Sequence, residues 1–157
     1  VETKEEWTRR STSIETARPT LNQSLEVLAE DFKKSFLSKE MSDVQIKCGD
    51  QTFDAHQFVL SARSPVFSRM LQSEMKEKTS GRVILRDTSP DVVSELLSFI
   101  YTGSCSIYGN ADPEMAGGLL EAADKYEMEH LKEMCQYTLS SSLTTENSLQ
   151  VGKSILN

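Results

Sequence analysis

Apolar and polar residues alternate between positions 43 and 55, and this pattern predicts the first structural unit of the chain. Residues 44–48 form one strand, with every second side chain apolar. Gly49 and Asp50 follow with turn chemistry, since glycine tolerates a positive φ, and residues 51–55 return as a second strand. The inward side chains of this hairpin are expected to be Val44, Ile46, Cys48, Phe53 and Ala55.

Helical spacing replaces the alternation immediately after the hairpin. A helix-like run extends from His56 to Ala62, and Ser64-Pro65 then starts a second helix. Serine can cap a helix, and proline is preorganised for its first position. The apolar spacing of this second helix stops at about Leu71, so the helix is expected to end soon after it.

Before the hairpin, large apolar residues recur at intervals of four, three, four and four. This spacing places them on one stripe of a helix that Thr20 or Asn22 could cap. Most amphipathic helices pack on their own domain, but this one precedes the compact unit. The pattern therefore leaves open whether the stripe packs within the chain or against a partner. The stripe consists of Leu21, Leu25, Leu28, Phe32 and Phe36.

After the second helix, a strand pattern and two helix-start signals divide the chain. Residues 82–87 alternate as a third strand, Ser89-Pro90 starts a helix that Gly103 can end, and Asp112-Pro113 starts another. Between these two helices, a short strand is expected from its apolar members Cys105, Ile107 and Tyr108.

The last third of the chain is expected to be helical with one interruption. Leu131, Met134, Cys135 and Leu139 share one helix face. Ser140 to Ser142 is expected to break this helix, and Thr144 or Thr145 would cap a final helix that runs toward Ile155.

Composition indicates one domain and narrows the classes of partner. The 157 residues contain 24 acidic and 17 basic side chains, a net charge of −7, which argues against a surface that follows nucleic-acid phosphates. No apolar run is long enough to span a membrane. Residues 1–20 are polar and are interpreted as a linker or tail.

Catalytic and metal-binding patterns are weak throughout. Cys48, Cys105 and Cys135 are widely spaced and are interpreted as buried free thiols of a reducing compartment; a zinc site needs more ligands. His56 is interpreted as a structural histidine. Gly117-Gly118 suggests close helix packing. The acidic pairs Asp112/Glu114 and Glu127/Glu129 are explained as solvated helix caps, so we predict neither an enzyme nor a cofactor.

The order of hairpin, helix, Ser-Pro and helix resembles the BTB/POZ domain. The likeness is carried by Asp43, Phe53, Ala55-His56, Leu60 and the string from Ala62 to Phe67, and it continues in residues 99–103 and 122–126. Residues 61–67 and 122–126 look most similar to the speckle-type POZ protein branch, which joins a MATH substrate-binding domain to a BTB domain. The resemblance implies an α+β fold over residues 21–143, with a small mixed sheet flanked by helices.

The resemblance also implies a homodimer. In BTB domains the first helix crosses to a second copy, and Leu28, Phe32 and Val59 match positions of that interface. Ser35 departs from the apolar residue expected at its position. Leu21, Leu25 or Phe36 could compensate.

A second implied surface is the loop after the Ser-Pro helix. BTB adaptors of Cullin-3 carry a hydrophobic-x-Glu motif there, and Met75-Lys76-Glu77 matches its two fixed positions. Met70 and Leu71 could add neighbouring apolar surface, while Phe67 could serve this surface or the core. Residues 144–157 resemble the start of the helical extension called the 3-box.

These features favour a substrate adaptor of a Cullin-3 ubiquitin ligase, located in the cytoplasm, the nucleus or both. Substrates would bind an upstream domain that lies outside this chain. Two alternatives stay open: a BTB module of a transcriptional repressor that holds a corepressor peptide, and an oligomerisation domain with no ligase role.

Overall fold

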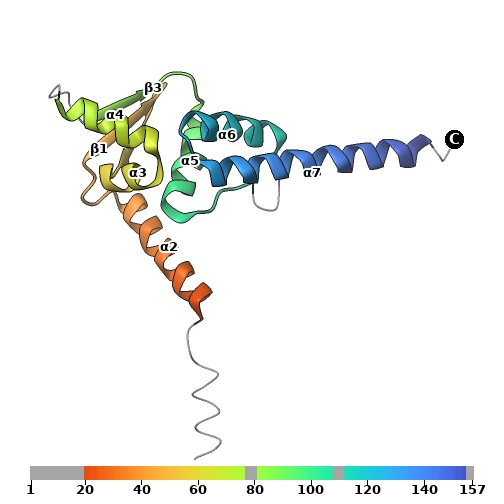
Figure 1. Ribbon diagram of the computed structural model, residues 1–157, viewed down its shortest axis with the longest axis horizontal. Helices are drawn as coiled ribbons and strands as arrows, with labels where there is room; N and C mark the ends of the chain where they lie inside the picture. Colours follow the sequence, from red (N-terminus) through yellow and green to blue (C-terminus); the bar gives the residue numbers. More distant parts are fainter. Residues whose placement is uncertain (1–19, 77–80, 108–111, 155–157) are drawn as a thin grey trace, which may run out of the picture.

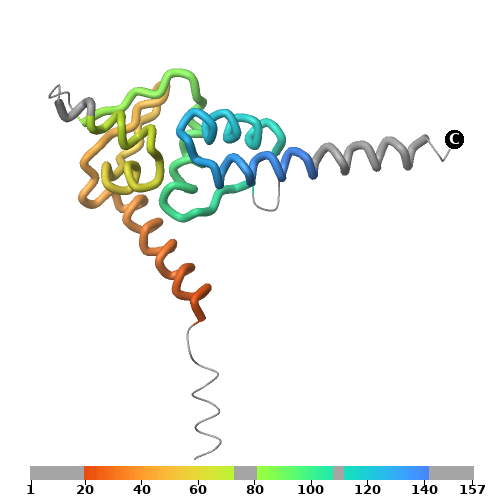
Figure 2. The backbone as a smooth tube through the Cα atoms, viewed as in Figure 1, coloured from red at the N-terminus to blue at the C-terminus, as the bar shows by residue number. Residues whose placement is uncertain are grey.

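The computed structural model describes the backbone of residues 20–76, 81–107 and 112–154 (Figures 1 and 2). Side chains are described for residues 20–72, 81–107 and 112–141. A small sheet and a set of helices form the body, and two helices extend away from it in different directions (Figure 1). The α+β class predicted from the sequence is therefore confirmed.

The sheet has three strands in the order β2-β1-β3 within the described residues. β1 (Val44–Cys48) pairs antiparallel with β2 (Gln51–Ala55) and parallel with β3 (Arg82–Leu85). Gly49 has a φ of +56°, which confirms the turn predicted for the hairpin. The predicted inward residues of the hairpin face the helices: Val44, Ile46, Cys48 and Ala55 are buried, and Phe53 is half-buried. Val83 and Leu85 of β3 are buried as well.

The buried Ser64 joins two helices to the body. It lies between α3 (Gln57–Arg63) and α4 (Pro65–Lys76). Its Oγ accepts a hydrogen bond from the N–H of Phe67 at 3.2 Å and donates one to the carbonyl of Tyr126 at 2.7 Å. The ring of Phe67 stacks on that of Tyr126 with a centroid distance of 4.6 Å, so Phe67 belongs to the core.

α5 (Pro90–Thr102) is the central helix of the core. The Ser89 Oγ accepts from the N–H of Val92, and Gly103 ends the helix with a φ of +72°. Both ends therefore form as the sequence predicts. Its buried side chains are Val92, Val93, Leu96, Leu97, Phe99, Ile100 and Tyr101.

α6 (Pro113–Lys125) begins at the predicted cap, where the carboxylate of Asp112 accepts from the N–H of Glu114 at 3.1 Å. A Cβ added to Gly118 would lie 2.7 Å from a methyl carbon of Val92, so this glycine lets α6 approach α5 closely. The same test at Gly117 meets nothing within 4 Å. The close packing predicted for the pair is therefore confirmed at Gly118 alone.

α7 (Glu129–Ser154) corrects the predicted break at Ser140 to Ser142, because the helix continues through these residues. The hydroxyls of Ser140 and Ser141 donate to the carbonyl of Tyr137 at 2.8 and 2.9 Å. Serine hydroxyls can make such bonds within a helix and need not end it. No separate cap forms at Thr144 or Thr145.

The strand predicted around Cys105 is also wrong over residues 103–107, where the chain bends at Gly103 and forms a turn at residues 106–107. Side chains of α5 form hydrogen bonds with the backbone groups that a strand would use to pair with a neighbouring strand. The Glu95 carboxylate accepts from the N–H of Ser106 at 2.7 Å, and the Thr102 hydroxyl bonds both the N–H and the carbonyl of Ser104. Cys105 and Ile107 are buried without pairing in the sheet, and Tyr108 lies outside the described residues.

Candidate interaction surfaces

α2 (Leu21–Ser38) projects from the body (Figure 1) and buries none of its residues. Thr20 starts it: the Thr20 Oγ1 accepts from the N–H of Gln23, and the Gln23 Oε1 accepts from the N–H of Thr20. The apolar stripe predicted for this helix faces solvent along most of its length. The exposed fractions are 75% for Leu21, 54% for Leu25, 52% for Leu28 and 37% for Phe32.

A groove of about 360 Å³ lies between α2 and the body. One wall is the apolar stripe of α2, and the other consists of α3 and the end of α5. Val59, predicted as a dimer contact, lines it together with Phe58, which is 77% exposed. The groove is lined by Leu25, Leu28, Ala29, Phe32, Phe58, Val59, Ala62, Arg63 and residues 100–103.

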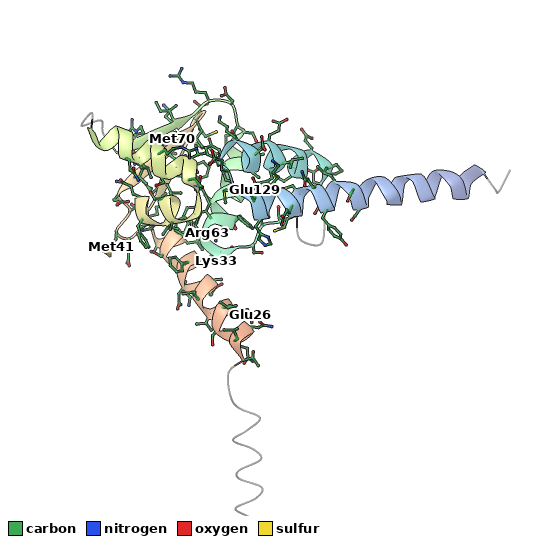
Figure 3. The ribbon with its side chains drawn as sticks, viewed as in Figure 1. Glu26, Lys33, Met41, Arg63, Met70 and Glu129 are labelled. Atoms are coloured by element: carbon green, nitrogen blue, oxygen red, sulfur yellow. The ribbon has the colours of Figure 1, made fainter. Side chains whose placement is uncertain are left out.

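Phe58, Ala62 and Arg63 are groove residues that the sequence prediction missed. Phe58 and Ala62 are four residues apart on α3 and so share a helix face, which is the signal that could have found them. Arg63 lies beside α2 in Figure 3, and its Nε donates to the carbonyl of Ile100 at 3.2 Å. Its guanidinium also lies 5.7 Å from the centre of the Phe99 ring.

Phe36 anchors α2 to its own domain, and its predicted role as a contact with a second copy stays a prediction. Its ring stacks on that of Tyr101, with centroids 4.6 Å apart, and it is half-buried. The stripe therefore divides: its last member packs within the chain, and the four before it remain exposed.

Tyr101 and His56 hold the base of α2 through one hydrogen-bonded cluster. The Tyr101 hydroxyl accepts from the backbone N–H of His56 at 2.9 Å and lies 2.8 Å from His56 Nδ1. His56 Nε2 lies 2.8 Å from the carbonyl of Glu40, just after α2. Because a carbonyl only accepts, Nε2 carries the proton and Nδ1 accepts from the tyrosine. The structural role predicted for His56 is thus confirmed.

Burial raises the pKa of Tyr101 to about 12. The hydroxyl therefore keeps its proton at neutral pH and can donate to His56 Nδ1.

Three of the predicted cullin-binding residues, Met70, Leu71 and Met75, belong to α4. Met75 belongs to its last turn by backbone, its side chain is not described, and Glu77 lies outside the described residues. Met70 is half-buried against the core. Leu71 is only 4% exposed, which corrects its placement on this surface: its spacing from Phe67 turns it inward.

The residues considered for chemistry have structural partners. Cys48, Cys105 and Cys135 are buried free thiols, and burial raises the pKa of Cys135 to about 11. The Glu127 carboxylate binds Arg69 at 2.6 Å. Within the described residues, no cluster of three His, Cys, Asp or Glu could hold a metal ion, and no helix is long and apolar enough to cross a membrane.

Comparison with known proteins agrees with this geometry. The family model of the BTB/POZ domain matches residues 32–143. Among solved structures, the BTB domain of zebrafish PATZ1 is similar with a TM-score of 0.65 and 21% sequence identity. The alignment covers 78% of this chain and 96% of that domain, and at this identity it shows a shared fold.

Proposed function

The chain belongs to the BTB/POZ family of protein-interaction and dimerisation modules, and from that premise we propose that it is a substrate adaptor of a Cullin-3 ubiquitin ligase. Two copies would associate through α2. Each copy would bind Cullin-3 through the end of α4 and the following loop, and substrates would be recruited by a separate upstream domain. The chain positions its partners and carries out no bond chemistry.

Homodimerisation is supported by the exposed stripe of α2. Leu25 and Leu28 each leave about half of their surface in water, beside a groove whose far wall includes the exposed ring of Phe58. Covering such side chains stabilises an interface by about 25 cal/mol per Å² of apolar surface. BTB domains commonly homodimerise, and a second copy supplies a matching stripe.

Cullin binding is supported by Met75 and Glu77, which match the hydrophobic-x-Glu motif after the Ser-Pro helix. The end of α4 lies at the upper left of the body in Figure 1, whereas α2 extends downward from it. The two proposed surfaces are therefore separate, and a dimer could present two cullin sites. Two linked sites raise avidity through effective concentration.

The buried thiols are compatible with the reducing environment of the cytoplasm or the nucleus, where we place the adaptor. A BTB module of a transcriptional repressor would also form this dimer, but it would bind a corepressor peptide. Cullin binding separates these functions.

Calorimetric titration with the N-terminal domain of Cullin-3 tests the proposal. Met75→Ala or Glu77→Lys is expected to weaken binding by about 2 kcal/mol or more, as truncation of an interface hot spot does, with little change in melting temperature. Met41→Ala is the matched control, because Met41 is 92% exposed and lies in the loop after α2.

Three results would contradict the proposal. Wild-type protein that does not bind the cullin domain would favour the repressor module or an oligomerisation domain. If Met41→Ala weakened cullin binding as much as Met75→Ala, the loop after α4 would not be the specific cullin site. A fall in melting temperature equal to the loss in binding would show that Met75 and Glu77 are structural.

A further inference from the structure

The outer face of the sheet carries basic side chains that the proposed function does not use. Side chains alternate along β3, so Val83 and Leu85 are buried while Arg82 and Ile84 point outward, and the exposed Arg86 continues that row. Lys47 on β1 is the register partner of Ile84 and is exposed beside it. The result is a row of cations around an isoleucine that is 54% exposed.

Two carboxylates close to this row in register or sequence, Asp54 and Asp87, have other partners, and Arg82 itself donates to the amide oxygen of Gln45 at 3.1 Å. Asp54 binds Lys39 at 3.4 Å and accepts from the Gln45 amide at 3.1 Å. Asp87 binds Lys125 at 3.4 Å, and Asp50 stands at the tip of the hairpin. In the described part of the chain, no carboxylate forms an ion pair with Lys47, Arg82 or Arg86. A chain with a net charge of −7 thus presents a basic face here.

The same residues also offer backbone groups. β3 is an edge strand in the described sheet, and it runs along the upper border of the body in Figure 1. The N–H of Gln45 donates to the carbonyl of Gly81 at 2.8 Å, which fixes the ladder: positions 81, 83 and 85 face β1. Arg82 and Ile84 therefore direct their N–H and C=O groups to the free edge. No other described residue bonds these groups.

We propose that this edge binds an extended acidic segment of another protein, which adds to β3 as a further strand. Backbone hydrogen bonds to Arg82 and Ile84 would hold it, as in other cases of strand addition. Side chains on one face of a strand recur every second residue. The segment would thus carry an acidic residue, an apolar residue and an acidic residue at alternate positions, opposite Arg82, Ile84 and Arg86.

A second copy of this chain is a poor occupant of the edge. Its β3 would bring Arg82 and Arg86 against the same two arginines, and like charges across a strand pair are destabilising. Basic residues on an edge strand prevent exactly such self-pairing. An acidic strand would instead be attracted to Arg82 and Arg86. The same two arginines therefore disfavour pairing with a second copy and favour an acidic partner.

The probe is the capped heptapeptide Thr-Glu-Thr-Val-Thr-Glu-Thr, titrated into the full chain and followed by amide NMR. Shift changes are expected at residues 82–86 and at Lys47, with slower hydrogen exchange at the Arg82 and Ile84 amides. Replacing both Glu by Lys in the peptide is expected to abolish binding. A peptide N-methylated on its edge-facing residues keeps its charges but cannot donate to β3, and it too should not bind.

On the protein side, Arg82→Glu with Arg86→Glu is expected to weaken peptide binding by about tenfold or more at low salt. Lys33→Glu with Lys34→Glu on α2 makes the same change in charge away from the edge and should leave binding unchanged. The inference is overturned if the N-methylated peptide or an oligo-dT strand binds as tightly as the acidic peptide, because either result indicates charge attraction alone. It is also overturned if the shift changes fall on α2.

The strand-binding proposal and the cullin-binding proposal can be contradicted by different results. Cullin binding that survives the Arg82→Glu and Arg86→Glu changes, together with lost peptide binding, supports two independent surfaces. If both ligands lose affinity equally, the edge belongs to the cullin site and the separate strand-binding site is wrong.

Discussion

α2 and α5 are both amphipathic helices, yet α5 lies inside its own domain and α2 does not. α5 has 13 residues, and its apolar side chains belong to the buried core, with α3 and α6 beside the helix. α2 has 18 residues, and none of them is buried. Only Phe36, at the base of α2, makes an aromatic contact with α5, through Tyr101. The apolar period predicts that one face of each helix is buried. It does not show whether that face packs within its own chain or against a second copy.

Truncation of one leucine in each helix is expected to give the largest difference between α5 and α2. Leu96→Ala in α5 removes a fully buried side chain and is expected to lower the free energy of unfolding by about 2–5 kcal/mol. Leu25→Ala in α2 is expected to have a smaller effect that grows with protein concentration, because the exposed side chain would be covered in the proposed dimer.

Urea unfolding at several protein concentrations measures both effects. Equal losses at all concentrations would mean that α2 packs within its own chain, and the distinction between the two helices would fail.

The second test concerns the contact that joins the two helices. Tyr101→Phe removes the hydroxyl that bonds His56 and is expected to cost about 1–2 kcal/mol of stability. Tyr126→Phe is the matched control: its hydroxyl is buried and bonds no described residue, so its loss should be neutral or slightly stabilising. Thermal unfolding of both variants measures the two changes in stability. A larger loss of stability for Tyr126→Phe than for Tyr101→Phe would contradict the role of the cluster.

The smallest expected effect appears at alkaline pH. Burial raises the pKa of Tyr126 to about 12, above the value of about 10 in an unfolded chain. Between these two pKa values the folded chain keeps the Tyr126 proton and the unfolded chain releases it. The fold therefore keeps its full stability below about pH 10 and loses stability as the pH rises toward 12.

At about pH 11 the loss from Tyr126 is expected to be about 1 kcal/mol, and Tyr126→Phe should remove that share of the decline. Tyr137→Phe is the control, because Tyr137 is 76% exposed. Urea unfolding between about pH 9 and pH 11 measures the slope. Identical slopes for wild type and Tyr126→Phe would show that the hydroxyl does not titrate as a buried group.

Sequence reasoning succeeded where structure is set by neighbouring residues. The hairpin turn at Gly49, the caps at Ser89 and Asp112 and the helix end at Gly103 each depend on contacts within a few positions. Ser140 to Ser142 was misjudged because serine hydroxyls can bond backbone groups inside a helix as well as at its end.

Features that depend on distant residues could not be predicted in the same way. The strand around Cys105 is absent over residues 103–107, where the Glu95 carboxylate, 11 residues away, accepts from the N–H of Ser106. The contact between Tyr101 and His56 joins positions 45 residues apart, and Leu71 proved to be core although its spacing also fits a surface. Such contacts follow from the packing of whole helices.

The most direct test of the account is the molar mass in solution of wild-type protein and of the variant with Leu28→Asp and Phe32→Asp. Both side chains lie on the exposed stripe of α2, so the two aspartates add charge to the face that we propose is buried between copies. Light scattering should report twice the mass of one chain for wild type and the mass of one chain for the variant, with unchanged circular dichroism. A monomeric wild type, or a variant that remains a folded dimer, would contradict the account.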